Sequence, residues 1–324
     1  MTKSEGECVC GRFVGVTEAA ALAAAEWVGR GDGLAGDVAA RQAMAAELSQ
    51  LSFRTRVVVS RGGRLEMDEP RLDESAIDGP LDLVVDPLQG HKALAQGSEG
   101  AIAMLAAGPQ GSIMAVPDMY MQKMIVAGQA AAAIDIDAPV VDNVKAVAAS
   151  LGRSPSDLSV AVLDRARHDD LIAEVKRSGA RLKLVDEGDV SAGVAAALRD
   201  TGVDLYMGIG GSIKGVIAAA ALRCLGGEIQ ARFWPVSRHQ VEEVKASGVA
   251  DVESRLTTKD MAGEGVLFAA TAVTGDRFLR GVEVRPEGAH TETLVLCSRC
   301  HAVRVVRTIH RSQNGGPRLC LQIR

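Results

Sequence analysis

Two arginines and a histidine lie close together in the second half of the chain, in the segment Arg165-Ala-Arg-His168. The segment follows an apolar run and precedes a helical pattern, which places it between a predicted strand and a predicted helix. Guanidinium groups bind phosphate through paired hydrogen bonds, and the free amides at a helix N-terminus add affinity for anions. We therefore predict that Arg165, Arg167 and His168 bind a phosphate group.

Glycines and a lysine follow the next two apolar runs, in Gly188-Asp189 and in Gly208-Ile-Gly-Gly211, which leads to Lys214. Lys214 begins a predicted helix, where the helix dipole disfavours a cation by about 0.3–1 kcal/mol unless an anion binds there. We predict that Lys214 meets a phosphate, and the alternative is a surface lysine with a packed stem. Because glycine lets the backbone approach a ligand closely, the same site is predicted to include Gly188, Asp189, Gly210 and Gly211.

Three strand–loop–helix units in series contain these residues, with predicted strands at 159–163, 181–185 and 204–207. Such units form a parallel sheet whose loops gather at the carboxyl edge of the strands, where ligands bind. The earlier part of the chain is predicted to form helices at 17–27 and 37–51 and strands at 56–60, 81–86, 101–107 and 112–116. Pro87 is expected to end the second strand, and 61–79 is predicted to be an acidic loop. Residues 261–273, 293–296 and 302–310 are predicted strands, the last two as a hairpin.

Composition favours a buried α/β protein, because 47% of the residues are hydrophobic and only 3% are aromatic. The formal net charge of -5 gives no bulk attraction to nucleic acid or to an anionic membrane. The first residues lack the apolar core of a signal peptide, and no run is long enough to span a membrane. We expect a cytoplasmic protein whose partner is a small molecule.

Cysteines cluster near both ends of the sequence. Cys297-Ser-Arg-Cys300-His301 matches the pattern for covalent haem, but that attachment requires export. Cys8, Cys10, Cys297 and Cys300 could together close a tetrahedral zinc site, although the first pair is spaced C-x-C. We expect reduced thiols on a hairpin and keep zinc as the alternative.

The chain resembles class II fructose-1,6-bisphosphatases, the sugar bisphosphatases of bacteria, from about residue 13 to residue 310. Several short motifs occur in the family's order; they are Val16-Thr-Glu-Ala-Ala-Ala-Leu22, Gly29-Arg-Gly-Asp32, Val85-Asp-Pro-Leu-Gln-Gly90, Pro117-Asp-Met-Tyr-Met121, Arg165-Ala-Arg-His168, Gly188-Asp-Val190, Gly208-Ile-Gly-Gly211 and Thr291-Glu-Thr293. The resemblance implies a layered αβαβα fold with two mixed sheets, a phosphorylated-sugar substrate and a homo-oligomer. It also implies that Tyr120 approaches the substrate, the alternative being a core role.

We expect a polar tail at 1–12 and one two-lobed unit over 13–324. A metal-site lobe would occupy about 13–140 and a sugar-phosphate lobe about 141–275, followed by a C-terminal hairpin and tail at about 276–324. Family members bind Mg²⁺ or Mn²⁺ through carboxylates, which polarise a phosphate and activate water.

The resemblance implies five acidic metal ligands, and this chain keeps two of them, Asp37 and Asp86. Arg61, Gln89 and Lys214 stand at the other positions, which brings the formal charge of the set to zero. His91 replaces the threonine expected to orient the attacking water. We expect that no metal is required and that Asp37 and Asp86 hold at most one Mg²⁺ or Mn²⁺ ion, because nearby cations repel a metal. The acidic side chains of Glu66, Asp68 and Glu69 are the alternative route to metal binding.

These substitutions lead to three functional hypotheses. The first is an enzyme that binds a phosphorylated sugar, has lost two-metal hydrolysis and uses His91 and Lys214 for metal-independent aldol, isomerase or epimerase chemistry, with Arg61 and Lys214 holding phosphate. The second is a non-catalytic sugar-phosphate sensor or a partner subunit of an active paralogue. The third is a retained metal-dependent bisphosphatase acting on fructose 1,6-bisphosphate or sedoheptulose 1,7-bisphosphate.

Overall fold

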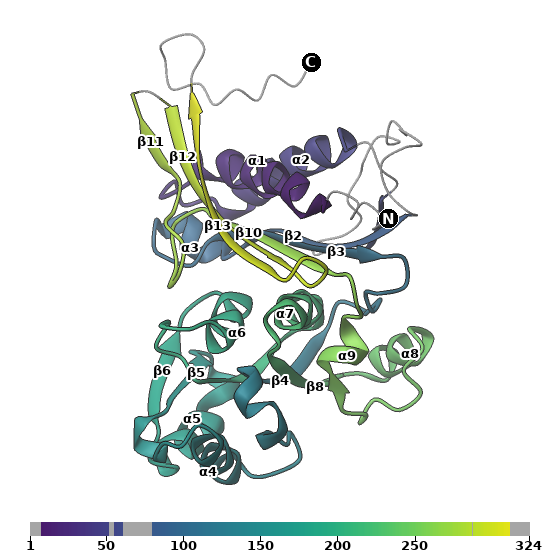
Figure 1. The fold of residues 1–324 in the computed structure, drawn as a ribbon, viewed down its shortest axis with the longest axis vertical. Coiled ribbons are helices and arrows are strands. Elements are labelled where there is room, and N and C mark those ends of the chain that lie inside the picture. Colours follow the sequence, from purple (N-terminus) through teal and green to yellow (C-terminus); the bar gives the residue numbers. More distant parts are fainter. Residues whose placement is uncertain (1–7, 52–54, 61–79, 287, 312–324) are drawn as a thin grey trace, which may run out of the picture.

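A computed structural model describes residues 8–51, 55–60, 80–286 and 288–311. Two mixed β-sheets alternate with three layers of helices, as Figure 1 shows. Helices α1 and α2 cover the outer face of the first sheet, α6 and α7 lie between the sheets, and α4 and α5 cover the outer face of the second. The predicted αβαβα fold is therefore confirmed.

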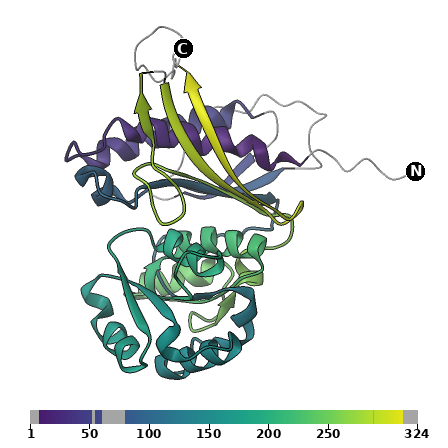
Figure 2. The same ribbon diagram turned by 60° about the vertical axis from the view of Figure 1, so that its left-hand side comes forward.

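The first sheet has the strand order β1-β2-β3-β10-β12-β11, and β13 also pairs with β12. Its strands are β1 (Thr55–Ser60), β2 (Leu81–Gln89), β3 (Ile102–Pro109), β10 (Leu267–Ala272), β11 (Glu283–Arg285), β12 (Gly288–Cys297) and β13 (Ala302–Arg311). The long β12–β13 hairpin extends beyond the sheet next to α1 and α2 (Figure 2).

The second sheet has the order β6-β5-β7-β4-β8-β9. Its strands are β4 (Tyr120–Val126), β5 (Ser159–Leu163), β6 (Arg181–Val185), β7 (Leu205–Gly211), β8 (Glu228–Phe233) and β9 (Leu256–Thr257). Strand β5 pairs in parallel with both β6 and β7, so the chain leaves β5 in one direction and later returns to its other side. This reversal creates a topological switch point at the carboxyl ends of β5 and β7, where open α/β sheets bind ligands.

The helices follow the predicted series, with additional short elements between them. They are α1 (Val14–Ala25), α2 (Gly33–Ser49), α3 (His91–Gln96), α4 (Val140–Ser150), α5 (Asp169–Arg177), α6 (Asp189–Ala197), α7 (Ser212–Leu225), α8 (Arg238–Ala246) and α9 (Thr258–Met261). Short 3₁₀ helices are η1 (Val9–Phe13), η2 (Gly128–Ala133), η3 (Pro155–Asp157) and η4 (Ala166–His168). None of these described helices is long and apolar enough to cross a membrane. Cytoplasmic location and homo-oligomer formation stay predictions.

Several local expectations differ from the structure. Strand β2 continues through Pro87 to Gln89, because the proline lies at a register shift where a backbone donor is not needed. The predicted strand at 112–116 is a loop with one isolated bridge at Ile113. The glycine run 208–211 ends β7 instead of forming a loop. Strands β4 and β8 were not predicted from the sequence. The chain enters the second sheet at β4, before the expected lobe boundary near residue 140.

Small residues form the layer between the sheets. Helix α7 is buried along most of its length, and its alanines at 218–221 are almost completely inaccessible. A helix that is apolar on all sides belongs between two covered sheets. The predicted core, poor in aromatics and rich in alanine and branched aliphatic residues, is confirmed.

A buried network of threonines joins α1 to the centre of the first sheet. The Thr271 hydroxyl donates to Thr17 and shares a second hydrogen bond with Thr293, both at 2.8 Å. Next to it, the Thr291 hydroxyl donates to the Glu18 carboxylate at 2.9 Å. The two motifs at 16–22 and 291–293 therefore lie side by side, and their hydrogen bonds connect α1 to strands β10 and β12.

Replacing the central hydroxyl should destabilise the protein, because Thr271→Val leaves two buried partners without their shared group. We expect the free energy of unfolding to fall by about 1–3 kcal/mol, measured by urea denaturation. Thr308→Val on β13 is the matched control, because Thr308 is only half-buried. Equal losses in the two variants would contradict a role for the network.

Candidate functional site

A polar pocket of about 540 Å³ opens at the switch point of the second sheet. Arg165 and Arg167 come from the loop after β5, Lys214 from the first turn of α7, and Tyr120 from the start of β4. The peptide segments Gly188–Asp189 and Gly210–Gly211 complete the predicted part of its lining. The sequence thus predicted most of the pocket, because parallel units bring these loops to one edge.

The two arginines are held in place by different partners. Arg167 donates from Nε and Nη2 to the Ile209 carbonyl at 3.1 and 2.8 Å, and its guanidinium lies 5.0 Å from the centre of the Tyr120 ring. Arg165 donates to the Glu187 carboxylate at 3.0 Å. Tyr120 is substantially exposed, which excludes the alternative of a buried core role. These contacts fix the guanidinium planes at the pocket wall.

His168 supports the pocket from behind instead of lining it. Its Nδ1 contacts the Leu163 carbonyl at 2.8 Å, and its Nε2 accepts a hydrogen bond from the Ile209 amide at 2.8 Å. Burial lowers the pKa of His168, in agreement with a neutral ring that donates from one nitrogen and accepts at the other. The prediction that His168 binds phosphate is therefore corrected, since both ring nitrogens are already used.

A buried ion pair forms the floor of the site. Lys123 of β4 lies 2.7 Å from the Asp189 carboxylate, and both side chains are 2% exposed. Burial alone would raise the pKa of Asp189, but the charges of Lys123 and Lys214 hold it well below its usual range. Burial lowers the pKa of Lys123, and Asp189 opposes that change. Lys123 was missed from the sequence, although a lysine in an apolar strand signals a buried partner.

Two positions that resemblance assigns to metal ligands meet at the same carboxylate. Gln89 Nε2 donates to Asp189 Oδ1 at 3.0 Å, and Lys214 Nζ lies 3.6 Å from that oxygen. The anion that offsets the position of Lys214 at the helix N-terminus is thus a side chain of the protein itself. Gly210 must lack a Cβ, because a Cβ there would lie 2.2 Å from Asp189 Oδ2.

The other metal-site candidates form a separate group. His91 Nε2 lies 3.1 Å from Asp37 Oδ1, while Arg41 contacts the other oxygen at 3.3 Å. Burial opposes ionisation of Asp37, but His91 and Arg41 lower its pKa overall. Asp86 is completely buried within β2. Among the described residues, Lys214 lines the pocket and His91 does not, so the structure does not place these two groups in one pocket.

Asp37 and Asp189 do not offer free oxygen ligands for a pair of divalent cations. Mg²⁺ and Mn²⁺ need several oxygen ligands, but Asp189 is already paired with two lysines and Asp37 with an arginine and a histidine. Arg61 and the acidic residues Glu66, Asp68 and Glu69 lie outside the described residues.

The layered fold holds this polar pocket at the switch point of its second sheet. The model of the family described as "Bacterial fructose-1,6-bisphosphatase, glpX-encoded" matches residues 8–310. The chain belongs to this class II fructose-1,6-bisphosphatase family, as the sequence motifs predicted.

Three curated relatives share the name D-fructose 1,6-bisphosphatase class 2/sedoheptulose 1,7-bisphosphatase. The protein of Synechococcus sp. (strain JA-2-3B'a(2-13)) is 39% identical over 94% of this chain and 96% of its own length. That of Synechococcus sp. (strain JA-3-3Ab) is 38% identical, with 96% and 98% covered. That of Gloeobacter violaceus (strain ATCC 29082 / PCC 7421) is 35% identical, with 92% and 94% covered.

Neutralising the buried carboxylate should strongly destabilise the protein, because Asp189→Asn leaves Lys123 as a buried charge with a poor partner. We expect a loss of about 3–5 kcal/mol at pH 7, measured by urea denaturation. The pKa of Asp189 is lower in the folded state than in the unfolded state. Its contribution to the free energy of unfolding is therefore complete above the unfolded-state pKa and is lost as pH falls below about 4. The difference between wild type and variant should therefore narrow towards pH 2.

Glu187→Gln is the control for this variant, because its carboxylate contacts Arg165 at the pocket wall and is partly exposed. We expect a loss of at most about 1 kcal/mol. A pH-independent difference between wild type and Asp189→Asn would show that the pair is not the source of the stability.

Proposed function

We propose that this protein hydrolyses a phosphate ester of a sugar bisphosphate, of the fructose 1,6-bisphosphate or sedoheptulose 1,7-bisphosphate type. The observation that carries the proposal is the pocket at the switch point, which Arg165, Arg167 and Lys214 line. Family membership over nearly the whole chain and the names of the relatives support this substrate class.

The pocket is suited to phosphate in both charge and shape. Four cations, Lys123, Lys214, Arg165 and Arg167, stand against three carboxylates, Asp118, Glu187 and Asp189, which leaves a formal excess of one positive charge. Guanidinium groups with fixed planes select the geometry of a phosphate over that of a spherical anion. The exposed Tyr120 ring offers a surface on which the sugar can pack.

Hydrolysis breaks the bond between phosphorus and the ester oxygen while a water oxygen attacks phosphorus from the opposite side, and one proton of that water ends on the released sugar hydroxyl. Negative charge then spreads over the three remaining phosphoryl oxygens. Preorganised cations stabilise that charge without reorganising, and such electrostatic stabilisation supplies much of the rate acceleration in many active sites. We expect Lys214 to supply this stabilisation, while Arg165 and Arg167 hold the phosphate equally in the ground state and in the transition state.

A second candidate is metal-independent carbon chemistry that uses the Lys214 amine. The position of Lys214 at the pocket wall favours it, because an amine next to a sugar carbonyl can form a Schiff base. His91 pairs with Asp37 instead of lining this pocket, so it does not supply the base that the scheme requires. Hydrolysis is therefore the better supported proposal.

Phosphate release from the two bisphosphates should be measured first in metal-free buffer and then with added Mg²⁺ or Mn²⁺. We expect release that falls by about 100-fold or more in kcat/KM in Lys214→Ala, because one transition-state cation is removed. Arg165→Met should mainly raise KM, by about tenfold, the equivalent of about 1.4 kcal/mol. Arg177→Met, on the exposed part of α5, is the matched control and should leave both constants unchanged.

The comparison of metal-free and metal-supplemented buffer separates the hypotheses. Release that requires added metal and disappears in Asp86→Asn identifies a retained metal-dependent bisphosphatase. Release in chelated buffer assigns the chemistry to the protein's own cations. Saturable binding of a bisphosphate without any product contradicts hydrolysis and leaves a sensor, while consumption of substrate without phosphate release indicates carbon chemistry.

A further inference from the structure

Four cysteine sulfurs lie close together outside the pocket described above. Cys8 and Cys10 lie at the start of η1, Cys297 ends β12, and Cys300 lies in the turn before β13. All four sulfurs lie within 4.8 Å of one another, and Cys10 and Cys297 are buried. Segments from the two ends of the described chain are thus joined by a cluster of identical soft ligands.

The distances between the sulfurs fit a metal ion better than a disulfide. Sγ of Cys8 lies 3.4 Å from that of Cys10 and 3.5 Å from that of Cys297, and Cys10 lies 3.9 Å from Cys300. A disulfide requires about 2.05 Å between sulfurs. A tetrahedral zinc ion bound at about 2.3 Å places its sulfur ligands about 3.8 Å apart. Three of the six distances between the sulfurs are close to this value, and all six lie within 4.8 Å.

The turn between β12 and β13 surrounds the sulfurs with hydrogen-bond donors. The backbone amides of Arg299 and Cys300 face the Cys297 sulfur, and the amide of Ala302 faces the Cys300 sulfur. His301 has a φ of 51°, a left-handed conformation that is uncommon outside glycine and that closes the turn tightly. Donors of this kind stabilise thiolates bound to a metal.

A cation lies next to the cluster as well. Arg304 of β13 donates from Nη1 to the Cys10 sulfur at 3.2 Å. Four thiolates around a divalent ion carry a net charge of minus two, which a neighbouring arginine partly offsets. Apolar packing of thiols explains neither this contact nor the amides directed at the sulfurs.

We propose that Cys8, Cys10, Cys297 and Cys300 form a structural zinc site. Four thiolates fill the tetrahedral coordination of Zn²⁺, so no open position remains for a substrate or an activated water. Binding replaces the thiol protons with the metal, and the sulfurs keep their oxidation state. The ion would fasten the N-terminal segment to the β12–β13 turn.

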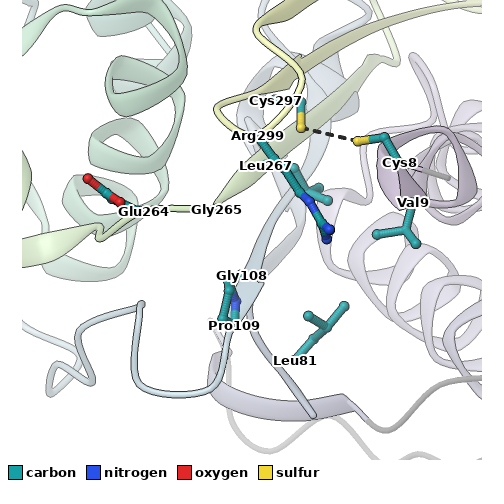
Figure 3. A pocket seen from close by; sticks show the side chains of 10 residues that line it. All are labelled: Cys8, Val9, Leu81, Gly108, Pro109, Glu264, Gly265, Leu267, Cys297 and Arg299. Atoms are coloured by element: carbon teal, nitrogen blue, oxygen red, sulfur yellow. Dashed lines mark hydrogen bonds between the residues drawn. The ribbon is translucent and has the colours of Figure 1, made fainter. Parts of the chain in front are cut away.

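An adjoining pocket of about 370 Å³ gives a metal ion access to the cluster. Cys8 and Cys297 form part of its wall, and their sulfurs point towards each other in Figure 3. Arg299 and Leu267 line the pocket near the cluster, while Glu264 lies at a distance from the sulfurs. The sulfurs are therefore reachable from solvent on one side.

Zinc should be measured by mass spectrometry on the full chain, purified with reductant and without chelator. We expect about one zinc ion per chain in the wild type, and its loss in Cys8→Ser and Cys300→Ser. After zinc is exchanged for Co²⁺, the protein should show thiolate-to-cobalt charge transfer and the intense visible bands of tetrahedral cobalt. The zinc-free chain should also melt at a lower temperature than the zinc-bound chain.

Cys224→Ser is the matched control, because Cys224 is half-buried and donates to the Val266 carbonyl instead of joining the cluster. It should retain its zinc. The wild type itself decides the proposal if a variant fails to fold. A reduced wild type that neither contains zinc nor takes up Zn²⁺ or Co²⁺ overturns it, as does retention of zinc in Cys300→Ser. A disulfide between Cys8 and Cys297, found by peptide mapping of the alkylated, non-reduced chain, also overturns it.

Discussion

The ion pair between Lys123 and Asp189 is the constraint on which the rest of the site depends. Both charges are almost completely removed from water, so each must be compensated by the other and by further hydrogen bonds. Lys123 also donates to the Gly211 carbonyl, and Asp189 accepts from Gln89 of the first sheet. One pair thereby fixes β4, the start of α6, the end of β7 and the contact between the two sheets.

This pair also determines which ligands the pocket can accept. A carboxylate that is engaged by two lysines has little negative charge left for a divalent cation, and the nearby guanidinium of Arg167 strengthens the positive field. A positive field of this kind favours an anionic ligand. Gln89 and Lys214 both contact this carboxylate, so their side chains contribute to the electrostatics of the site within the family fold.

The positions of site residues that belong to regular strand–loop–helix units could be predicted from the sequence. The roles of residues whose partners are distant in the sequence could not. The strand–loop–helix series placed Arg165, Arg167 and Gly210 at one edge, because parallel strands align their carboxyl ends. Lys123 was missed, since its role depends on a partner far along the chain. His168 was assigned to phosphate because a histidine next to arginines suggests binding, whereas the fold uses both ring nitrogens to join β5 and β7.

The carboxylates near the pocket and the four cysteines are two groups of candidate metal ligands with different chemistry. This difference affects how the metal content of the purified protein should be interpreted. The described residues around Asp189 and Asp37 are poor in free oxygen ligands, whereas the four cysteines provide soft thiolates that select zinc over Mg²⁺ or Mn²⁺. Metal found in the purified protein would therefore not by itself indicate a catalytic ion. Because the thiolates leave no open coordination position, only metal that survives loss of the cysteine cluster bears on hydrolysis.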